Sequence, residues 1–496
     1  MTGFLEVLLS LSKTVVTFMW GNWMILLLVG TGILLSIMTR FVQIRQFRLS
    51  IKYLFQGGKK SEILKDTQGD ISPFAALMTA LAATVGNGNI AGVASAIATG
   101  GPGAPLWMWI SGFIGMATKY AECFLGIKFR KVAEDGSMAG GPMYYCRYGI
   151  KNESIGKFLG MLFAVCGGIT ALMGTGNMMQ SNSMALAWKS QFNIPTIVSA
   201  VVITGLVGVV IIGGIKRIGA VSEKLVPTMI LFYLGGAFVI LIAKISELDD
   251  AFVTIFKSAF SVKAMGGALI GTSVQKAISL GVRRGVLSNE AGLGSAAIAQ
   301  SAAKSPDPTF NGLLGMTGVF IDTLLVNTLT TLTIVVTGVW KLTPACGLEL
   351  IKEGEPFTAL ASLPPQVHEM AQKLGYDLAA GGLSSTALTV QAFNSVIPYG
   401  GIIIAVASFF FGYTTLLGWA YYGEQCIGYI WGVKSHMPYR IVFIILLFFG
   451  ALMTGKYLDI VWNVGDTFNA IMAIPNLVGL IFLSRIVART TRETFR

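Results

Sequence analysis

Charged residues are scarce in this sequence, and their scarcity excludes an ordinary soluble domain. Asp, Glu, Lys and Arg make up only 12% of the 496 residues, whereas 54% are hydrophobic. Soluble domains carry about 25% charged residues. The formal net charge is +12, but the basic residues lie in loops between apolar stretches and not on one soluble face, which argues against nucleic-acid binding. The composition indicates an integral membrane protein.

Histidine and cysteine are also rare, which narrows the possible chemistry. The two histidines, His368 and His436, lie far apart, and the five cysteines show no paired spacing. This pattern argues against a zinc site and against a disulfide framework. Neither an H-E-x-x-H motif nor a G-x-S-x-G motif occurs, and we therefore do not expect an enzyme.

Long apolar stretches dominate what is present. Eleven of them come close to or exceed the length of about 20 residues that crosses a bilayer. The first is not followed by a small-residue cleavage site, so it predicts a retained helix and not a signal peptide. We expect an all-α integral membrane protein with 11 transmembrane helices. The stretches are 18–38, 72–99, 104–125, 155–186, 195–214, 222–245, 264–282, 311–338, 398–423, 438–453 and 461–484.

The basic residues predict how the chain is oriented in the cell inner (plasma) membrane. Residues 39–70 hold seven Lys and Arg, and such segments stay on the cytoplasmic side. Alternation from there places the N-terminus outside and the C-terminus in the cytoplasm. The seven are Arg40, Arg45, Arg48, Lys52, Lys59, Lys60 and Lys65.

The number of spans predicts an internal repeat. Ten spans remain once the first is set aside, and they divide into five and five. Because five is odd, the two halves would insert in opposite orientations, as in inverted-repeat transporters. We expect an extra helix and a basic cytoplasmic loop over residues 1–70, one five-helix repeat over 71–260 and its inverted partner over 261–496. In such folds a discontinuous helix opens each half.

The span 72–99 has the clearest sign of an interruption. Its centre, residues 84–89, reads T-V-G-N-G-N, and unwound backbone at membrane depth is tolerated only inside protein or beside a polar cavity. Carbonyl groups around Ala82 and Val85 would be free to attract a cation, and N–H groups of 86–89 an anion. This predicts a site for a small zwitterion together with a metal cation. The alternative is that the glycines only allow close helix packing.

The second half contains a weaker counterpart. The span 264–282 includes M-G-G-A-L-I-G-T-S at 265–273, which predicts a second break near Gly271 and Thr272, with simple packing as the alternative. The polar segment 288–295 after it is expected on the cytoplasmic side, either as a re-entrant or surface-lying gate element or as a plain loop. The long segment 341–397 is expected outside, where its end could cap a vestibule.

Polar side chains within the spans are further candidates. Asp322 is a carboxylate inside 311–338, which makes it a functional hypothesis, with a purely structural hydrogen bond as the alternative. Asn177 and Gln180 share one helix face. Thr414 and Thr415 could supply neutral oxygens to a hard cation such as Na⁺. Sodium is favoured because residues 84–89 contain no titratable side chain, although Asp322 keeps proton coupling open.

Several runs together resemble the alanine or glycine:cation symporter family. They are T-V-G-N-G-N-I-A-G-V-A at 84–94, G-G-P-G-A at 100–104, W-M-W-I-S-G-F-I-G-M-A-T-K-Y-A-E at 107–122, G-G-P-M-Y-Y at 140–145, R-G-V-L-S-N-E-A-G-L-G-S at 284–295, F-I-D-T at 320–323 and G-W-A-Y-Y-G-E at 418–424. The resemblance covers nearly the whole chain. It implies a leucine-transporter-type five-plus-five inverted repeat with one additional N-terminal helix.

The same resemblance implies roles for particular residues. Gly86, Asn87 and Gly88 would bind the substrate carboxylate, and Asn87 stands where the family more often has Ser or Thr. Thr84 and Asn89 would face a first sodium ion. Carbonyls at the break and two hydroxyls would hold a second. The carbonyls are those of Ala82 and Val85 and the hydroxyls those of Thr414 and Thr415. The polar residues of the spans and the second predicted break, and not the resemblance, add Asn177, Gln180, Gly271 and Thr272 to the expected substrate site and Asp322 as a further functional residue.

The function that follows is sodium-coupled symport of a small neutral amino acid, alanine or glycine, into the cell by alternating access. A sodium-coupled glutamine symporter is the alternative, followed by a proton-coupled transporter or a channel. We expect Na⁺, the amino acid and the lipid bilayer as the only partners, without nucleic acid and without an obligatory protein partner.

Overall fold

The computed structural model describes residues 2–56, 67–260, 274–305, 307–346, 369, 371–372, 383 and 385–495. The described chain is almost entirely helical, with one short antiparallel hairpin that the all-α expectation did not include, formed by β1 (Lys131–Val132) and β2 (Met138–Ala139). The N-terminal region and the first half contain α1 (Thr2–Met19), α2 (Asn22–Met38), α3 (Val42–Arg45), α4 (Phe47–Gln56), α5 (Pro73–Thr84), η1 (Gly88–Gly92), α6 (Val93–Gly100), α7 (Ala104–Lys128), α8 (Pro142–Gly149), α9 (Glu153–Met173), α10 (Met178–Phe192), α11 (Thr196–Ile211), α12 (Gly214–Ala243), η2 (Ile245–Glu247) and α13 (Leu248–Phe260).

The described part of the second half is also helical. Its elements are α14 (Val274–Asn289), α15 (Ser295–Ser301), α16 (Pro308–Val319), η3 (Phe320–Asn327), α17 (Thr328–Val336), η4 (Val339–Leu342), η5 (Pro344–Cys346), α19 (Ser385–Asn394), α20 (Gly401–Trp431), η8 (Val433–Ser435), α21 (His436–Leu452) and α22 (Gly455–Thr494).

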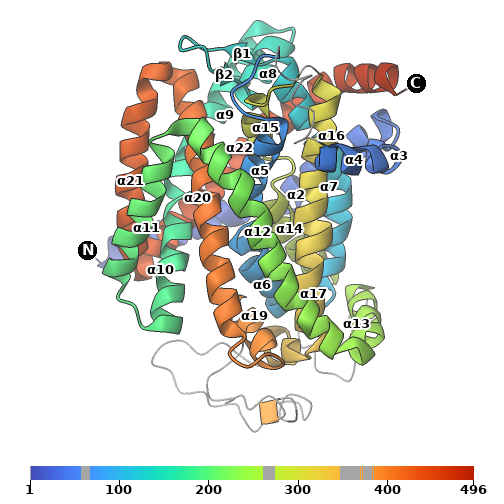
Figure 1. Ribbon diagram of the computed structural model, residues 1–496, viewed down its shortest axis with the longest axis vertical. Coiled ribbons are helices and arrows are strands. Elements are labelled where there is room, and N and C mark those ends of the chain that lie inside the picture. The colour runs from blue at the N-terminus through green and yellow to red at the C-terminus, as the bar shows by residue number, and fades with distance from the viewer. Residues whose placement is uncertain are drawn as a thin grey trace.

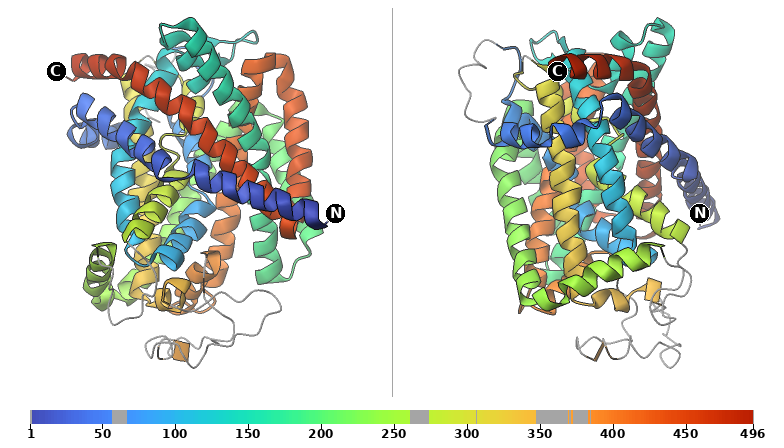
Figure 2. Two further views of the ribbon diagram at one scale, coloured as in Figure 1. Left: turned by 180° about the vertical axis from the view of Figure 1, so that it is seen from behind. Right: turned by 90° about the vertical axis from the view of Figure 1, so that its right-hand side faces the viewer.

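The long helices form one bundle along the longest axis of the molecule (Figure 1). Within the described part of the chain, seven helices are long and apolar enough to cross a membrane, or eight when a bent pair counts as one span. The protein is therefore a multi-pass helical membrane protein, while the expected number of 11 spans stays a prediction. α4, α8 and the C-terminal end of α22 lie at one end of the bundle, and α13 and α19 lie at the other (Figures 1 and 2).

Close backbone approach holds the bundle together at its centre. α9 packs against α20 and α22, and α7 packs against α14 and α16. A side chain added at Gly465 of α22 would place its Cβ 2.2 Å from the Cα of Gly174, at the end of α9. Small residues permit such contacts in membrane bundles, where dispersion contacts replace the hydrophobic effect as the driving force between helices.

The interruption predicted at residues 84–89 is confirmed. α5 begins where the Ser72 hydroxyl accepts a hydrogen bond from the Ala75 N–H, 3.0 Å away, and it ends at Thr84. Helix resumes at Gly88 as one π-helical turn and continues as α6. The two halves are bent by 47°. The break leaves the last carbonyl groups of α5 without helical donors, apart from Leu81, whose carbonyl accepts from the Val85 N–H.

The second interruption predicted near Gly271 and Thr272 stays a prediction, and the described residues contain a different one further along the chain. Residues 261–273, with Gly271 and Thr272, lie outside the described residues, and α14 runs without a break to Asn289. The chain leaves the helical path at 290–294 and resumes as α15. α14 packs against α6, and α15 packs against α5. The two interruptions therefore meet inside the bundle.

Of the alternatives given for 288–295, a surface-lying element is wrong, because this segment is buried, whereas a re-entrant element stays a prediction. Gly292 and Gly294 adopt left-handed backbone angles, with φ of 98° and 81°. Their N–H groups both donate to Oε1 of Glu122 on α7, at 2.9 and 3.1 Å. A carboxylate from a neighbouring helix thus satisfies backbone groups that would otherwise be too costly to bury.

Candidate functional site

A cavity of about 980 Å³ opens beside the break in α5–α6. It reaches from the break to the end of the bundle that carries α19 (Figure 1). The interruption between α9 and α10, which the sequence analysis did not predict, forms a second wall through Thr175, Met179 and Gln180. The lining includes six predicted residues, namely Thr84, Gly86, Asn87, Gly88, Gln180 and Thr415.

Three polar atoms of residues that line this cavity have no hydrogen-bond partner within the described residues: Asn87 Oδ1 and the hydroxyls of Thr175 and Ser408. The Asn87 side chain donates through Nδ2 to Gln180 Oε1 at 3.1 Å, which leaves its Oδ1 unpaired and buried. The hydroxyl of Thr175 is in the same condition. Leaving a buried polar group unpaired costs about 1–3 kcal/mol. A ligand with hydrogen-bond donors would relieve that cost.

Gly86 is the point of closest approach between the break and α20. A Cβ added there would lie 2.6 Å from the Thr415 hydroxyl oxygen, so the contact requires glycine. The Gly86 N–H donates to Asn89 Oδ1 at 2.8 Å. Gly88 is roomier, since its added Cβ would lie 3.7 Å from the nearest atom, the Cα of Ser288.

Behind the break, the buried side-chain amide of Asn89 lies close to more oxygen atoms than it can donate hydrogen bonds to. Asn89 Nδ2 lies 2.6 Å from Asp322 Oδ1, 2.9 Å from Asn327 Oδ1 and 3.1 Å from Ser288 Oγ. The Asp322 main-chain oxygen is a fourth neighbour at 3.4 Å. An amide nitrogen carries only two hydrogens. We call Asn89, Ser288, Asp322 and Asn327 the oxygen cluster.

The fold explains why the oxygen cluster assembles. Residues 320–327 form the π-helical element η3, whose wider turn directs both Asp322 and Asn327 toward the break. π-helical turns inside longer helices are frequent at functional sites. Asp322 also accepts from the hydroxyls of Ser288 and Thr323, at 3.0 and 2.8 Å. The carboxylate is fully buried, and its hydrogen bonds come from neutral groups only among the described residues.

Other predicted residues take different positions. The Thr414 hydroxyl bonds to the Phe410 carbonyl at 3.0 Å and faces Met229 of α12, so it is not part of the cavity lining. Asn177 donates to the Phe443 carbonyl at 3.0 Å, also away from the lining. Ala82 and Val85 are buried at the end of α5.

The sequence analysis missed a carboxylate at the cavity. Glu290 lines the cavity at the second interruption, is only 3% exposed and has the left-handed φ of 55°. Its Oε1 accepts from the indole N–H of Trp419 at 3.0 Å. The signal available in the sequence was a carboxylate within the run S-N-E-A-G-L-G-S at 288–295, but the burial of that carboxylate could not be inferred from the run.

A charged pair borders the same cavity further out. The Asp466 carboxylate on α22 lies 3.6 Å from the guanidinium group of Arg283 on α14. Asp466 lines the cavity, and so does Arg284, which follows Arg283 in the chain. The indole of Trp20 donates to the main-chain oxygen of Asp466 at 3.0 Å. The pair therefore joins the helix ahead of the second break to the last long helix.

Hydrogen bonds from Arg130 fix the segment that leads into the N-terminal end of α5. Arg130, just beyond α7, donates to the carbonyls of Ala303 at 2.6 Å and Gln68 at 2.8 Å. It thereby links the segment before α5 to the segment before α16. Burial is the main influence on the pKa of Arg130 and lowers it. In the same region burial raises the pKa of Asp70, which accepts a hydrogen bond from the Met138 N–H.

A broken membrane helix beside a deep cavity, in a multi-pass bundle, is typical of membrane transporters of small solutes. The chain belongs to the sodium:alanine symporter family, whose family model matches residues 5–362 and 370–496. This confirms the resemblance noted from the motifs, and the protein is a transporter and not an enzyme.

Individual relatives agree with this placement. The chain is 44% identical over 483 residues to the sodium/alanine symporter AgcS of Methanococcus maripaludis, covering 97% of this chain and 96% of that protein. It is 31% identical over 481 residues to a Bacillus subtilis protein named "Probable sodium/glutamine symporter GlnT", covering 96% and 89%. Among solved structures, a manganese transporter of Eremococcus coleocola aligns over 84% of this chain and 75% of its own at 14% identity, with a TM-score of 0.47.

Proposed function

We propose that this protein carries a small neutral amino acid, alanine or glycine, into the cell together with Na⁺. The observation that carries the proposal is the cavity at the break, where unpaired buried polar atoms face open space beside an interrupted membrane helix. An unpaired donor or acceptor at such a place is best explained by a ligand that completes it.

The substrate is proposed to lie against Gly86–Gly88. Its carboxylate would bind the N–H groups at the start of η1, where the helix dipole favours negative charge. Its ammonium group would donate to the unpaired Asn87 Oδ1 and to the hydroxyl of Thr175. Gln180 positions the Asn87 amide through their hydrogen bond. The glycines are needed because the ligand approaches the backbone itself.

The oxygen cluster is the proposed first sodium site. The oxygens of Ser288, Asp322 and Asn327 would hold one cation, and oxygen ligands suit a hard ion. The Asn89 amide would move aside to admit the cation, because its Oδ1 accepts from the Gly86 N–H and its Nδ2 faces these oxygens. Thr84 lies next to it on α5 but bonds to the Ala80 carbonyl at 3.2 Å.

A second sodium site is proposed between the end of α5 and α20. The carbonyl groups of Ala82 and Val85 would combine with the hydroxyl of Thr415, which already faces Gly86. Thr414 is not proposed as a ligand here, because its hydroxyl faces Met229. Coupling follows because each cation offsets the negative charge of the substrate carboxylate in a site of low dielectric constant.

We infer that the cavity opens to the outside. The short helices α3 and α4 and the C-terminal end of α22 lie together at the end of the bundle opposite to α19 (Figures 1 and 2). Both regions carry arginines, which the positive-inside rule assigns to the cytoplasm. Alternating access would then require the Arg130 contacts to release before α5 can move and open the inner side.

Uptake by proteoliposomes of stated internal composition tests the proposal. Radiolabelled alanine, glycine, serine and glutamine are each offered with NaCl or choline chloride outside, at one fixed pH. We expect saturable uptake of alanine or glycine that needs Na⁺. Preferential uptake of glutamine would establish the alternative substrate, and uptake driven equally by a proton gradient in choline would overturn sodium coupling.

A further inference from the structure

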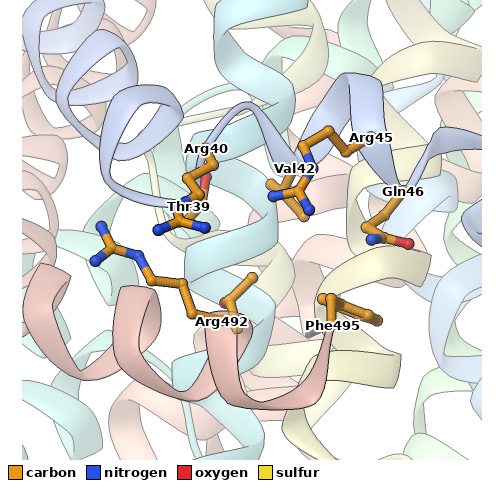
Figure 3. A pocket seen from close by; sticks show the side chains of 8 residues that line it. Thr39, Arg40, Val42, Arg45, Gln46, Arg492 and Phe495 are labelled. Carbon is orange, nitrogen blue, oxygen red and sulfur yellow. The ribbon is translucent and has the colours of Figure 1, made fainter.

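A basic pocket lies at the periphery of the bundle, far from the transport cavity in the chain and in its lining. It has a volume of about 190 Å³ and lies between the N-terminal segment and the end of α22. In Figure 3, Arg40 and Arg45 extend from the N-terminal segment toward the end of α22, where Arg492 lies, and Phe495 directly follows that helix. None of these residues takes part in the proposed transport site.

The charge of this pocket is not balanced by the protein. Arg40, Arg45 and Arg492 make no ion pair within the described residues, and Arg492 donates instead to the Met38 carbonyl at 2.8 Å. The nearby acid, Glu493, is paired with Arg489 at 2.8 Å. Three guanidinium groups around one space repel one another unless an anion lies between them.

The same region continues into a second basic hollow. This one has a volume of about 240 Å³ and is lined by Arg485, Arg489 and Arg492 together with Met38, Ala488 and Glu493, whose carboxylate pairs with Arg489. Arg492 and the end of α2 therefore belong to both spaces. The arginines form a continuous basic groove along the last turns of α22.

Apolar side chains flank the arginines and are turned outward. Ile37, Phe41 and Ile44 are 58%, 45% and 59% exposed, although each is a large hydrophobic residue. They follow one another along the turn from α2 into α3. A soluble phosphate compound has no apolar part that would contact these side chains. A lipid has both a charged headgroup and acyl chains, which can contact the arginines and the apolar side chains together.

The backbone that brings these groups together is fixed in an unusual shape. Arg40 and Phe41 both have left-handed φ angles, 57° and 55°. For residues other than glycine such angles cost about 1–3 kcal/mol and persist where surrounding structure imposes them. Here the Phe41 N–H donates to the Ser36 carbonyl at 2.6 Å, and Arg492 holds the end of α2 from the other side.

We propose that this pocket binds the headgroup phosphate of an anionic phospholipid, with Ile37, Phe41 and Ile44 against its acyl chains. Basic pockets between membrane helices on the cytoplasmic side bind such headgroups. The proposal rests on the inferred orientation, which places this end in the cytoplasmic leaflet, but not on the identity of the transported substrate.

Native mass spectrometry of the purified full chain in detergent tests the site. Dioleoyl phosphatidylglycerol and dioleoyl phosphatidylcholine are titrated separately, and the triple variant Arg40→Gln/Arg45→Gln/Arg492→Gln is compared with the unchanged protein. We expect wild type to prefer the anionic lipid and the triple variant to lose that preference by roughly tenfold or more. The matched control is Arg147→Gln/Lys151→Gln/Arg217→Gln, which removes three positive charges at the same end outside the pocket and should keep the preference.

Two further arms keep the result decisive. The single variant Arg45→Gln, whose side chain has no protein hydrogen bond among the described contacts, should lower the preference severalfold if the triple variant fails to fold. Glycerol phosphate, which has the headgroup chemistry without acyl chains, should not displace bound lipid at millimolar concentration. The proposal is overturned if the pocket variants bind as wild type does, if the control triple loses as much, or if glycerol phosphate competes fully, which would indicate a soluble anion.

Discussion

The two helix interruptions that meet at the centre of this protein are built in opposite ways. At residues 85–88 the break leaves polar atoms unpaired beside a cavity, notably Asn87 Oδ1. At 290–294 the protein itself completes the break, because Glu122 accepts two backbone N–H groups and Trp419 donates to Glu290. The comparison indicates that the interruption at 85–88 has polar atoms available to bind ligands. The interruption at 290–294 has a structural role, because other parts of the protein satisfy its polar groups.

The strongest way to break this comparison is to close the first interruption. Gly86→Ala would place a methyl group 2.6 Å from the Thr415 hydroxyl oxygen, and such overpacking costs about 1–3 kcal/mol. We expect Na⁺-dependent alanine uptake to fall roughly tenfold or more. Gly92→Ala is the matched control, since nothing lies within 4 Å of its added Cβ and no ligand contact is proposed there, and it should retain uptake within a few-fold. Equal losses in both variants would argue against a site set by the close approach at Gly86.

A second test removes the charge of the oxygen cluster. Asp322→Asn keeps the shape of the side chain but loses its negative charge, and interactions with charged groups are worth about 1.5–3 kcal/mol. The Na⁺ concentration for half-maximal uptake should rise about tenfold or more. Asp459→Asn, an exposed carboxylate on α22, serves as control and should leave it unchanged. An unaltered Na⁺ dependence in Asp322→Asn would remove this residue from the cation site.

A third test weakens the hydrogen bonds by which Glu122 stabilises the interruption at 290–294. Glu122→Gln retains an oxygen for Gly292 and Gly294 but weakens each bond by removing the charge. We expect lower thermal stability of the purified protein, by about 1–3 kcal/mol, with the Na⁺ requirement of the remaining active protein nearly unchanged. A large shift in Na⁺ requirement without loss of stability would show that this interruption also takes part in ligand binding.

The smallest effect is expected at the threonine pair. Thr415→Ala should raise the Na⁺ concentration for half-maximal uptake by roughly threefold, because it removes one neutral ligand. Thr414→Ala should leave it unchanged, since its hydroxyl faces Met229 and its own helix. Equal behaviour of the two variants in uptake titrations would contradict the assignment of Thr415 alone.

The contrast between these regions also explains what the sequence could predict. The first break was predictable because two glycines and two asparagines at mid-span have no place in a lipid-facing helix. The interruption at 290–294 was not predicted, because its backbone is satisfied by Glu122, which lies some 170 residues away in the chain. The glycines of 265–273 drew the prediction to a segment outside the described residues, where it stays a prediction.

The candidate site was predictable only in its local parts. The run 84–89 named Gly86, Asn87 and Asn89 without any knowledge of the fold. The link from Asn89 to Asp322 spans 233 residues and depends on the packing of η3. The choice between Thr414 and Thr415 depends on the rotation of α20, which hydrophobic periodicity does not fix when both faces of a helix are buried.

The most direct test of the account is the affinity of the purified protein for alanine, measured by titration calorimetry in NaCl and in choline chloride at the same pH and ionic strength. The account predicts that Na⁺ tightens alanine binding at least tenfold, that alanine tightens Na⁺ binding by the same factor, and that Asp322→Asn abolishes this coupling. Equal alanine affinity in the two salts would contradict it.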